Sequence, residues 1–295
     1  MTQTPSVAEA EDDHRAIRTR DGLELRTYEW LAVGDARACV LLVHGIAEHA
    51  GRHAHVAERL ARAGIHTHAF DLRGFGHSTG HRAYVDRWTL YHDDLEDRLA
   101  DVRRIAGGSP IVLYGHSMGG LIALGYVLSE PQRALPDLLV LSAPAIDAIV
   151  PAWQRGLAGA LGVVAPRFAV ANAFRKGALS SDPAVDAAYR ADPIAVHRTT
   201  ARLGSEALLE QARVRKALAL GGPLPVTTYV LHGADDAIVP ESATRSLEGR
   251  GNVTRRVYPG LRHETHNEPS GGAVIDDTIA WIDAAITSGR AKASG

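Results

Sequence analysis

The chain of 295 residues has little cysteine, few aromatic residues and no excess of charge of either sign. Cys39 is its only cysteine, so no internal disulfide can form and no thiolate cluster is available for zinc or iron–sulfur. Cys39 lies in an apolar run, where core packing is expected rather than nucleophilic chemistry. Lys and Arg total 32 against 34 Asp and Glu, which leaves a formal charge of −2. This balance argues against nucleic acid as a partner.

Long apolar segments are also missing. Residues 1–15 have no basic start followed by an apolar stretch, so they do not resemble a secretory signal and we expect a disordered lead-in. The longest nearly uncharged apolar segment outside the expected strands covers residues 156–166, far short of the ~20 residues that a spanning helix needs. We therefore expect a soluble protein that is cytoplasmic by default, with peripheral membrane association as an open alternative.

Short β-rich runs alternate with helical patterns, and no internal repeat is present. Hydrophobic residues make up 45% of the chain, enough for a sizeable core. Compact apolar runs that suit buried parallel strands cover residues 38–43, 67–71, 111–114, 138–141 and 226–231, and residues 23–30 alternate like a half-buried strand. Helical patterns cover residues 55–63, 90–106 and 118–129. The alternation predicts an α/β fold with a mostly parallel sheet.

The alternation stops near Pro151 and resumes near Pro223. The segment between them is rich in Ala, Gly, Leu and Arg and shows no convincing strand. Because a structureless loop of that length is uncommon, we expect a helical insertion over the carboxyl edge of the sheet. The expected organisation is a lead-in at 1–15, a core at 16–150 and 223–290, the insertion at 151–222, and a polar tail at 291–295 after a helix over 273–288.

The strongest local pattern is IVLYGHSMGG at residues 111–120. It places G-x-S-x-G between a strand and a helix, the context in which Ser117 would be lifted above the sheet on a strained turn. Side chains at positions 115 and 119 would collide there, which explains the two glycines. The Met118 amide would lie at a helix N-terminus. The bare string is weak and also fits a glycine-rich turn with an ordinary serine, but the flanking strand and helix favour a nucleophile. The partners of Ser117 decide between these two interpretations.

Two later strands end in loops that carry such partners. The strand at 226–231 is followed by Asp235 and Asp236, and the loop after another short strand carries His263. A serine needs a base to take its proton, and the base needs a third group to orient it. The order Ser, Asp, His at strand ends is that of α/β-hydrolases, and the carboxyl ends of parallel strands converge at one edge of a sheet. At this stage either aspartate can be the acid.

An upstream loop supplies a fourth candidate element of the site, beside the serine, the aspartate and the histidine. The run at 38–43 ends in His44-Gly45-Ile46, and a glycine-containing loop after this strand supplies an oxyanion amide in this architecture. We assign that amide to Ile46. For His44 we expect a structural hydrogen-bonding role beneath the loop.

These stretches together resemble one family, the monoacylglycerol lipase or lysophospholipase-like branch of the α/β-hydrolases, also called serine aminopeptidase S33, in its bacterial form. The matching segments are HGIAEHAGRHAHVAERLARAG, FDLRGFGHSTGHRAYVDRW, YGHSMGG, VLSAPA, LHGADDAIVP and YPGLRHETHNEP. The resemblance implies an α/β-hydrolase core with a lid formed by residues 151–222, whose apolar face guides lipid chains.

By this resemblance Ser117 is the nucleophile, His263 the base and Asp236 the orienting acid. Asp236 is preferred to Asp235 because the acid of the family falls three residues after the glycine of its "HG" pair, which is Gly233 in this chain. The oxyanion amides implied are those of Ile46 and Met118.

The resemblance also implies a polar corner for the glycerol end of a substrate. Glu48, Arg52 and His266 match positions near it, and His116 lies beside the nucleophile. Glu48 and Arg52 fit equally well as a structural ion pair that braces the oxyanion loop.

Three features depart from the animal members of the family. Residues 71–77 are closer to bacterial relatives, and Ala237 and Ile238 follow the acid where animal enzymes have reactive cysteines nearby. The insertion matches weakly. The sequence therefore does not transfer a preference for acyl chain or head group.

No metal or cofactor is expected. Four histidines between His44 and His55 lack a carboxylate or cysteine at ligand spacing, and HETH at 263–266 is one residue short of a zinc-protease motif. The glycine-rich run at 74–80 has one residue too many for a dinucleotide fingerprint and no helix after it.

The sequence thus predicts a carboxylic ester hydrolase that releases fatty acid and glycerol from monoacylglycerols through an acyl-enzyme, with a small lipid ester as its partner. Lysophospholipids and small soluble esters are alternatives of the same chemistry. A peptidase would use Glu48 to anchor an α-amino group, and a non-catalytic binding protein is a further class. The apolar run at 156–166 either contacts a membrane surface or packs on the core, and the oligomeric state stays open, a homodimer included.

Overall fold

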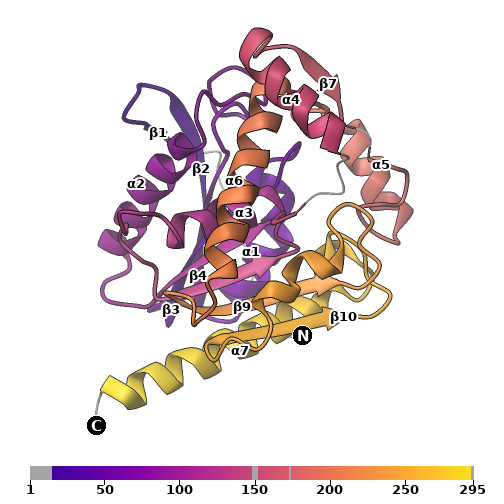
Figure 1. The fold of residues 1–295 in the computed structure, drawn as a ribbon. Coiled ribbons are helices and arrows are strands. Elements are labelled where there is room, and N and C mark those ends of the chain that lie inside the picture. The colour runs from indigo at the N-terminus through magenta and orange to yellow at the C-terminus, as the bar shows by residue number, and fades with distance from the viewer. Residues whose placement is uncertain (1–14, 148–151, 173, 294–295) are drawn as a thin grey trace, which may run out of the picture.

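The computed structural model describes residues 15–147, 152–172 and 174–293, and its centre is an eight-stranded sheet (Figure 1). The strands are β1 (Ala16–Arg18), β2 (Glu24–Trp30), β3 (Ala38–Val43), β4 (Ile65–Phe70), β5 (Ile111–His116), β6 (Leu138–Ser142), β9 (Thr227–Gly233) and β10 (Val253–Tyr258). They lie in the order β1-β2-β4-β3-β5-β6-β9-β10. β2 is antiparallel to both of its neighbours, and all other neighbouring strands are parallel. The predicted mostly parallel sheet is confirmed.

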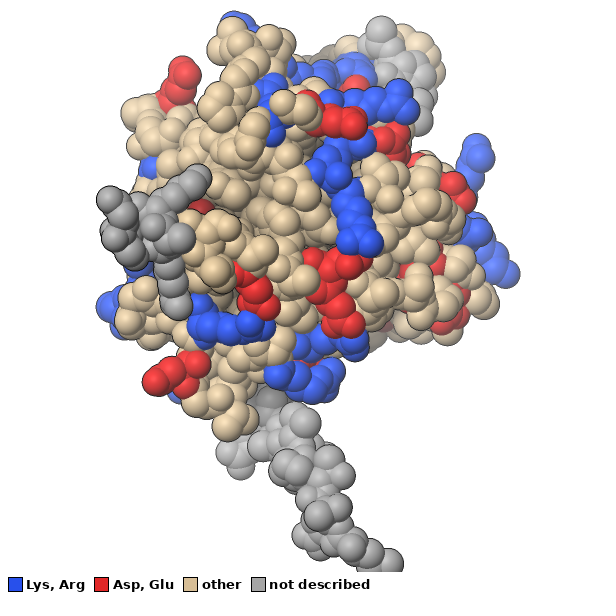
Figure 2. All heavy atoms as spheres, turned by 90° about the horizontal axis from the view of Figure 1, so that it is seen from below, with Lys and Arg blue, Asp and Glu red and all other residues tan. Residues whose placement is uncertain are grey.

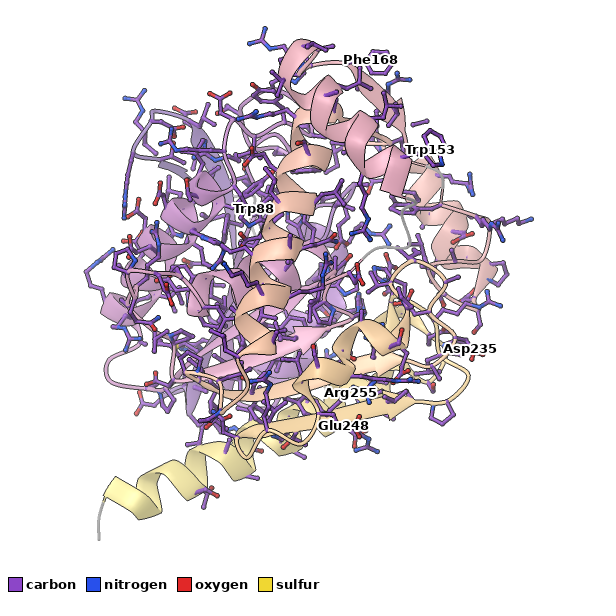
Figure 3. The ribbon with its side chains drawn as sticks, in the orientation of Figure 1. Trp88, Trp153, Phe168, Asp235, Glu248 and Arg255 are labelled. Carbon is purple, nitrogen blue, oxygen red and sulfur yellow. The ribbon has the colours of Figure 1, made fainter. Side chains whose placement is uncertain are left out.

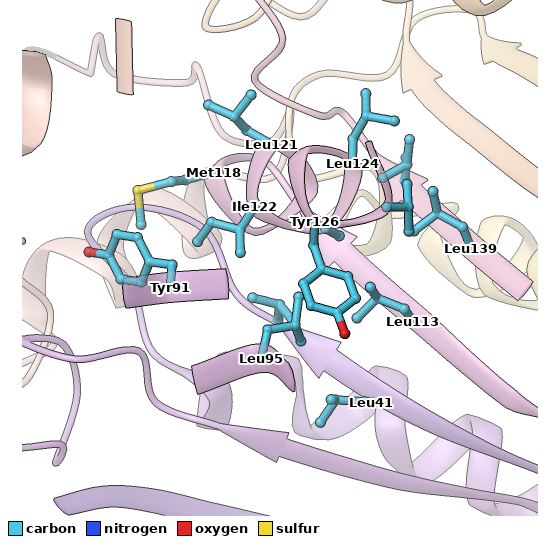
Figure 4. Close-up of a cluster of buried hydrophobic side chains, with 14 of the residues drawn as sticks. Leu41, Tyr91, Leu95, Leu113, Met118, Leu121, Ile122, Leu124, Tyr126 and Leu139 are labelled. Carbon is cyan, nitrogen blue, oxygen red and sulfur yellow. The ribbon is translucent and has the colours of Figure 1, made fainter. Parts of the chain in front are cut away.

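Helices cover both faces of this sheet. The helices that pack on the sheet are α1 (Ala54–Arg62), α2 (Thr89–Ile105), α3 (Met118–Val127), α6 (Ala201–Ala219) and α7 (Gly271–Ala293). α2, α3 and α6 contribute to one buried apolar cluster, and α1 and α7 contribute to a second cluster on the opposite face. Figure 4 shows part of the first cluster, in which side chains of α3 pack between α2 and the sheet.

β3 shows why the central strands read as unbroken apolar runs. All six of its residues are buried. Cys39, Leu41 and Val43 belong to one cluster, whereas Ala38, Val40 and Leu42 belong to the other. Successive side chains of a strand point to opposite faces, so a strand covered on both sides needs an apolar residue at every position. Each large side chain buried in this way contributes about 1.5–3 kcal/mol.

Residues 152–219 form a cap above the sheet. Its elements are α4 (Ala152–Val164), β7 (Ala169–Ala171), α5 (Pro183–Ala191), β8 (Arg198–Thr200) and α6. In Figure 1, α4, β7 and α5 lie at the upper right, and α6 runs from beside α4 down across the front of the sheet. Leu203, Val214 and Leu218 of α6 belong to the core cluster, so this helix anchors the cap to the core.

Two expectations for these segments are wrong. The insertion was expected to lack strands, but β7 pairs antiparallel with β8. Each has only three residues, too few for an alternating pattern to emerge from the sequence. The expected end of the last helix at residue 288 is also wrong, because α7 runs from Gly271 to Ala293. The polar tail at 291–295 stays a prediction.

The lead-in predicted for residues 1–15 lies outside the described residues except for Arg15, whose carbonyl accepts a hydrogen bond from the Thr27 amide. Within the described parts of the chain, every helix is too short or too polar to cross a bilayer. On the face seen from below, basic and acidic side chains are interleaved, so neither sign dominates this surface (Figure 2).

Candidate active site

Ser117 lies in a strained turn between β5 and α3. Its backbone angles are φ 53° and ψ −116°, a region that residues other than glycine rarely adopt. The Ser117 amide donates to the Ser142 carbonyl at 2.9 Å, and the Ser117 carbonyl accepts from the amides of Leu121 and Ala145. These bonds hold the turn in place and keep the hydroxyl above the end of the sheet.

The glycines around Ser117 permit close approach of backbone segments. A Cβ added at Gly115 would lie 2.5 Å from the Gly119 carbonyl oxygen, and one added at Gly119 would lie 2.2 Å from the Val43 carbonyl oxygen. A Cβ at Gly120 would meet Pro144 at 2.8 Å. The collision predicted for positions 115 and 119 is therefore confirmed. α3 can begin directly against the end of β3 only because these side chains are absent.

His263 lies in the loop after β10 and contacts Ser117. Its Nε2 is 2.9 Å from Ser117 Oγ, and its Nδ1 is 2.7 Å from Asp236 Oδ2. Since a carboxylate only accepts, Nδ1 carries the proton and Nε2 is left to accept the Ser117 hydroxyl proton. All three side chains are buried. The geometry thus joins an alcohol, an imidazole and a carboxylate in one chain of hydrogen bonds.

Four hydrogen-bond donors bind the Asp236 carboxylate, and none of these donors binds the Asp235 side chain. Asp236 Oδ1 accepts from the amides of Ile238 and Val239 at 2.8 and 2.9 Å. Its Oδ2 accepts from His263 and, at 3.1 Å, from Nε2 of His232. Asp235 is exposed at the outer edge of the same loop (Figure 3). Of the two aspartates that the sequence offered, only Asp236 bonds the imidazole.

The charges of this pair stabilise each other. Burial alone would raise the pKa of Asp236, but the neighbouring His263, the His232 hydrogen bond and the Val239 amide outweigh it and lower that pKa well below its usual range. Burial alone would lower the pKa of His263, and the Asp236 carboxylate outweighs this effect, so the pKa of His263 is raised. The carboxylate therefore stays charged and makes the imidazole a stronger base.

The loop after β3 approaches Ser117 closely and is held by His44. The His44 ring donates from Nδ1 to the Gly45 carbonyl at 2.7 Å and accepts the Leu72 amide at Nε2 at 2.9 Å. In a trans peptide the carbonyl and the next N–H point in opposite directions, so fixing the Gly45 oxygen also fixes the Ile46 N–H. A Cβ added at Gly45 would lie 3.0 Å from Ser117 Cβ, which shows how closely this loop approaches the serine.

Met118 supplies a second amide, at the first position of α3. Its side chain belongs to the same buried cluster as Tyr91 (Figure 4), which anchors the start of the helix. Within the described part of the chain, the amides of Ile46 and Met118 make no hydrogen bond. Unpaired backbone donors close to a serine hydroxyl can stabilise a developing oxyanion, so both amides are candidates for that role.

A buried polar cluster lies behind the loop. The Glu48 carboxylate accepts from the Gly45 amide at 2.5 Å and from His53 Nε2 at 3.1 Å. Arg52 lies 3.4 Å from Glu48 and donates to both oxygens of Glu264 at 2.8 Å. Burial would raise the pKa of Glu48, but His53 and the other basic neighbours lower it well below its usual range. Glu48 is therefore a charged group that holds the loop after β3 through the Gly45 amide.

His116 and His266 complete this cluster. The ring centre of His116 lies 5.0 Å from that of His263 and 5.0 Å from that of His266. His116 Nδ1 also lies 3.2 Å from Ser142 Oγ. Burial and the neighbouring imidazoles lower the pKa of both His116 and His266 well below the usual range, so both rings are neutral. Nδ1 of His266 is buried and has no hydrogen-bond partner among the described residues.

Sequence reasoning missed three supporting residues. These are His232, which bonds Asp236, Glu264, which pairs with Arg52, and His53, which bonds Glu48. His232 had a visible signal, because His232-Gly233 repeats the His44-Gly45 pair at the end of another strand. The pairings of His53 and Glu264 depend on side-chain directions that no spacing in the chain specifies.

Comparisons with known proteins agree with this geometry. The family model described as serine aminopeptidase S33 matches residues 34–270. A monoacylglycerol lipase of Mycolicibacterium smegmatis is 38% identical over 268 residues, which cover 86% of this chain and 90% of that protein. These similarities confirm the family resemblance drawn from the sequence.

Two solved structures extend the comparison. The crystal structure of Paleococcus ferrophilus monoacylglycerol lipase is 26% identical, with a TM-score of 0.79, and covers 89% of this chain and 99% of that one. A soluble variant of monoglyceride lipase from Saccharomyces cerevisiae, in complex with a substrate analog, has a TM-score of 0.82 at 22% identity and covers 96% and 99%. The second likeness concerns the fold alone.

Proposed function

Because the chain belongs to the serine aminopeptidase S33 family of α/β-hydrolases, we propose that it is a carboxylic ester hydrolase that cleaves monoacylglycerols into fatty acid and glycerol. One observation carries the chemical part of this proposal. Asp236, His263 and Ser117 form a continuous chain of hydrogen bonds at 2.7 and 2.9 Å. The monoacylglycerol lipases among its relatives support the substrate class.

In the proposed reaction His263 Nε2 takes the proton of Ser117 as its oxygen attacks the ester carbonyl. The amides of Ile46 and Met118 donate to the oxyanion of the tetrahedral intermediate. His263 then passes the proton to the departing glycerol oxygen, which leaves an acyl group on Ser117. Water, deprotonated by the same imidazole, attacks the acyl carbonyl and releases the fatty acid. Asp236 keeps the imidazole in the required tautomer throughout.

We assign the glycerol end of the substrate to the corner formed by Glu48, Arg52, His116 and His266. Two of them already act as a brace, since Glu48 bonds the oxyanion loop and Arg52 bonds Glu264. His266 retains an unpartnered, buried Nδ1, a group that a glycerol hydroxyl could satisfy. The two roles left open by the sequence are therefore compatible, because a pre-bonded corner binds hydroxyls without reordering itself.

The structure favours ester hydrolysis over peptidase activity. An aminopeptidase needs an acidic group that is available to an α-ammonium. Glu48, the residue considered for that role, is only 4% exposed, and its oxygens accept from Gly45 and His53. An incoming ammonium would have to displace these partners. All three side chains of the proposed triad are present and bonded, so a purely binding role has no support.

A substrate panel tests the proposal. The protein is assayed on p-nitrophenyl esters of increasing chain length beside 1- and 2-monoacylglycerols and an aminoacyl p-nitroanilide. We expect the wild-type protein to hydrolyse the monoacylglycerols and the p-nitrophenyl esters and to release no p-nitroaniline. Ser117→Ala should hydrolyse none of these substrates. Turnover confined to the anilide, or full ester activity in Ser117→Ala, would contradict the proposal.

We also propose that the cap contacts a lipid surface. Six large apolar side chains in the outer part of the cap, residues 152–172, are at least half exposed: Trp153, Leu157, Val163, Val164, Phe168 and Val170. Trp153 and Phe168 point outward on the cap in Figure 3. An exposed apolar patch on one face of a helix is typical of an interfacial segment.

Vesicle binding tests this cap surface. Trp153→Ser with Phe168→Ser should weaken co-sedimentation with phosphatidylcholine–phosphatidylglycerol vesicles several-fold, whereas Leu220→Ser, at the distant end of α6, should not. Equal binding by all variants would contradict a membrane contact. A dimer that dissociates in the double variant would show instead that the patch joins two copies.

The cytoplasmic location stays a prediction from the sequence.

A further inference from the structure

The loop after β10, which carries His263, also holds a buried carboxylate that the proposed reaction does not use. Glu268 is only 5% exposed. Its Oε1 accepts from the Arg262 amide at 2.8 Å, within the loop itself. Its Oε2 accepts from the Ser181 amide at 2.9 Å and from the Ser181 hydroxyl, and the Ser180 hydroxyl lies 3.2 Å from the same oxygen. Because both serines belong to the cap segment that precedes α5, one carboxylate joins this loop to the cap.

Further bonds to the same cap segment flank His263 on both sides. The residue before it, Arg262, donates from Nη1 to the Ser180 carbonyl at 3.0 Å. The residue after it, Glu264, donates its backbone amide to the Leu179 carbonyl at 2.8 Å. The backbone of His263 therefore lies between two residues that are each hydrogen-bonded to the cap.

The other side of the loop packs on the end of β9. A Cβ added at Gly233, the last residue of that strand, would lie 2.2 Å from the Arg262 carbonyl oxygen. The two backbones can approach this closely only because position 233 has no side chain. The loop after β10 is thus confined between the end of β9 and the cap segment, and the cap supplies one of the two surfaces that fix its position.

The position of this loop matters because His263 has to meet two partners at once. Its Nδ1 lies 2.7 Å from Asp236 and its Nε2 lies 2.9 Å from Ser117. A shift of about 1 Å in a catalytic group can lower the rate about 10²-fold. A small displacement of the loop would lengthen both hydrogen bonds, since the imidazole moves with the backbone that carries it.

We propose that Glu268 is a positioning residue, which holds the His263 imidazole between Asp236 and Ser117 by fastening the loop after β10 to the cap. The effect on turnover rests on the proposed function, whereas the effect on the hydrogen bond between His263 and Asp236 rests on geometry alone. The seating of the cap then acts on the base of the reaction as well as on the entry of the substrate.

Glu268→Gln tests the proposal. The variant keeps the length of the side chain, but its amide nitrogen cannot accept a hydrogen bond, so either the Arg262 amide or the Ser181 donors lose their acceptor. We expect kcat on p-nitrophenyl butyrate to fall about 10–100-fold while KM stays within about twofold, because the substrate contacts are unchanged.

Two further measurements separate positioning from a general loss of stability. The proton that His263 Nδ1 shares with Asp236 should give a low-field resonance in the proton NMR spectrum of the wild-type protein, absent from His263→Gln. In Glu268→Gln this resonance should weaken or move to higher field. The midpoint of the pH profile should also fall, because the Asp236 contact is what raises the pKa of His263. The other carboxylates that face this imidazole, Glu264 and Glu48, stay in place in the variant.

Glu206→Gln is the matched control. Glu206 lies in α6 and accepts the Trp88 amide at 2.7 Å, so its carboxylate also joins the cap to the core. Glu206 bonds Trp88 and Arg202, both outside the loop after β10. This variant should lower the Tm as a lost cap contact does, and leave kcat, the pH midpoint and the low-field resonance unchanged.

A variant on the cap side tests the same link without touching the loop. Ser180→Ala with Ser181→Ala removes two hydroxyls that reach the loop, but keeps the Glu268 charge and the Ser181 amide. We expect smaller changes in the same direction. Combined with Glu268→Gln, the loss in kcat should be less than the product of the separate losses, because both changes break one connection.

The outcomes decide as follows. If Glu268→Gln lowers the Tm but leaves kcat and the resonance as in the wild-type protein, the carboxylate is purely structural and the proposal is overturned. Equal losses of kcat in Glu206→Gln would overturn it as well. If Glu268→Gln does not fold, the serine variant decides by the same criteria. If the wild-type protein hydrolyses no ester, only the proposed function fails, and the resonance still tests the role of Glu268.

Discussion

Nε2 of His263 lies 2.9 Å from Oγ of Ser117, although 146 residues separate the two in the chain. Ser117 follows β5 and His263 follows β10, and parallel strands place both loops at the same edge of the sheet. The fold thus builds the contact by bringing strand ends together. The predictions below follow from this contact and from the groups that support it.

The first prediction concerns pH. The Asp236 carboxylate raises the pKa of His263 above its ordinary value of 6.5, and only the neutral imidazole can accept the Ser117 proton. kcat/KM should therefore be low in acid, rise through a single ionisation with its midpoint above 6.5, and then level off. Asp236 adds no second step in this range, because its own pKa is lowered. The pH profile of glycerol release from an uncharged monoacylglycerol checks this, and a midpoint below the ordinary histidine value would contradict it.

The second prediction distinguishes two adjacent aspartates. Asp236→Asn removes the charge that orients and supports His263, so kcat should fall about 10⁴-fold. Asp235→Asn is the matched control, since the Asp235 side chain is exposed. The hydrogen bond from the backbone amide of residue 235 to the Leu261 carbonyl would persist. Steady-state kinetics of both variants on one ester should show the loss in Asp236→Asn alone. Comparable losses in both variants would mean that the acid is misassigned.

The third prediction concerns the start of α3. Gly119→Ala would force a Cβ to within 2.2 Å of the Val43 carbonyl and 2.6 Å of the His44 carbonyl, and these backbone atoms cannot move aside cheaply. We expect a loss of about 3 kcal/mol or more in the free energy of unfolding, or failure to fold. Thermal or urea unfolding measures this directly.

Gly156→Ala in α4 is the control for that experiment. A Cβ at Gly156 meets nothing within 4 Å, so the replacement should stabilise the helix by about 0.5–1 kcal/mol. If Gly119→Ala were as stable as the wild-type protein, the close packing of α3 against β3 described above would be incorrect.

Much of the core fold could be predicted from the sequence, because burial on both faces leaves a clear mark. The expected strand at 38–43 matches β3 (Ala38–Val43), and the expected helix at 90–106 lies within one residue of α2 (Thr89–Ile105). β7 and β8 could not be found in this way. Strands of three residues on a partly exposed cap carry no periodic pattern, and their pairing is set by contacts distant in the chain.

The residues of the candidate site could likewise be predicted only in part. Ser117 and His263 follow from motif and strand order, which a sequence displays. The choice of Asp236 over Asp235 needed the family's spacing at first, and the structure gives its physical reason in burial and hydrogen bonds. Partners such as Glu264 and Tyr189 could not be predicted, because their contacts with Arg52 depend on rotamers and on how the cap is seated.

The central claim is that Ser117 carries the acyl group during turnover, and mapping that group tests it most directly. The protein would be mixed with excess p-nitrophenyl butyrate, quenched with acid within the first turnovers, digested and analysed by mass spectrometry. We predict one butyryl group, on the peptide that contains Ser117, and neither acylation nor measurable turnover in Ser117→Ala. A butyryl group on another residue, or turnover by Ser117→Ala at the wild-type rate, would contradict the account.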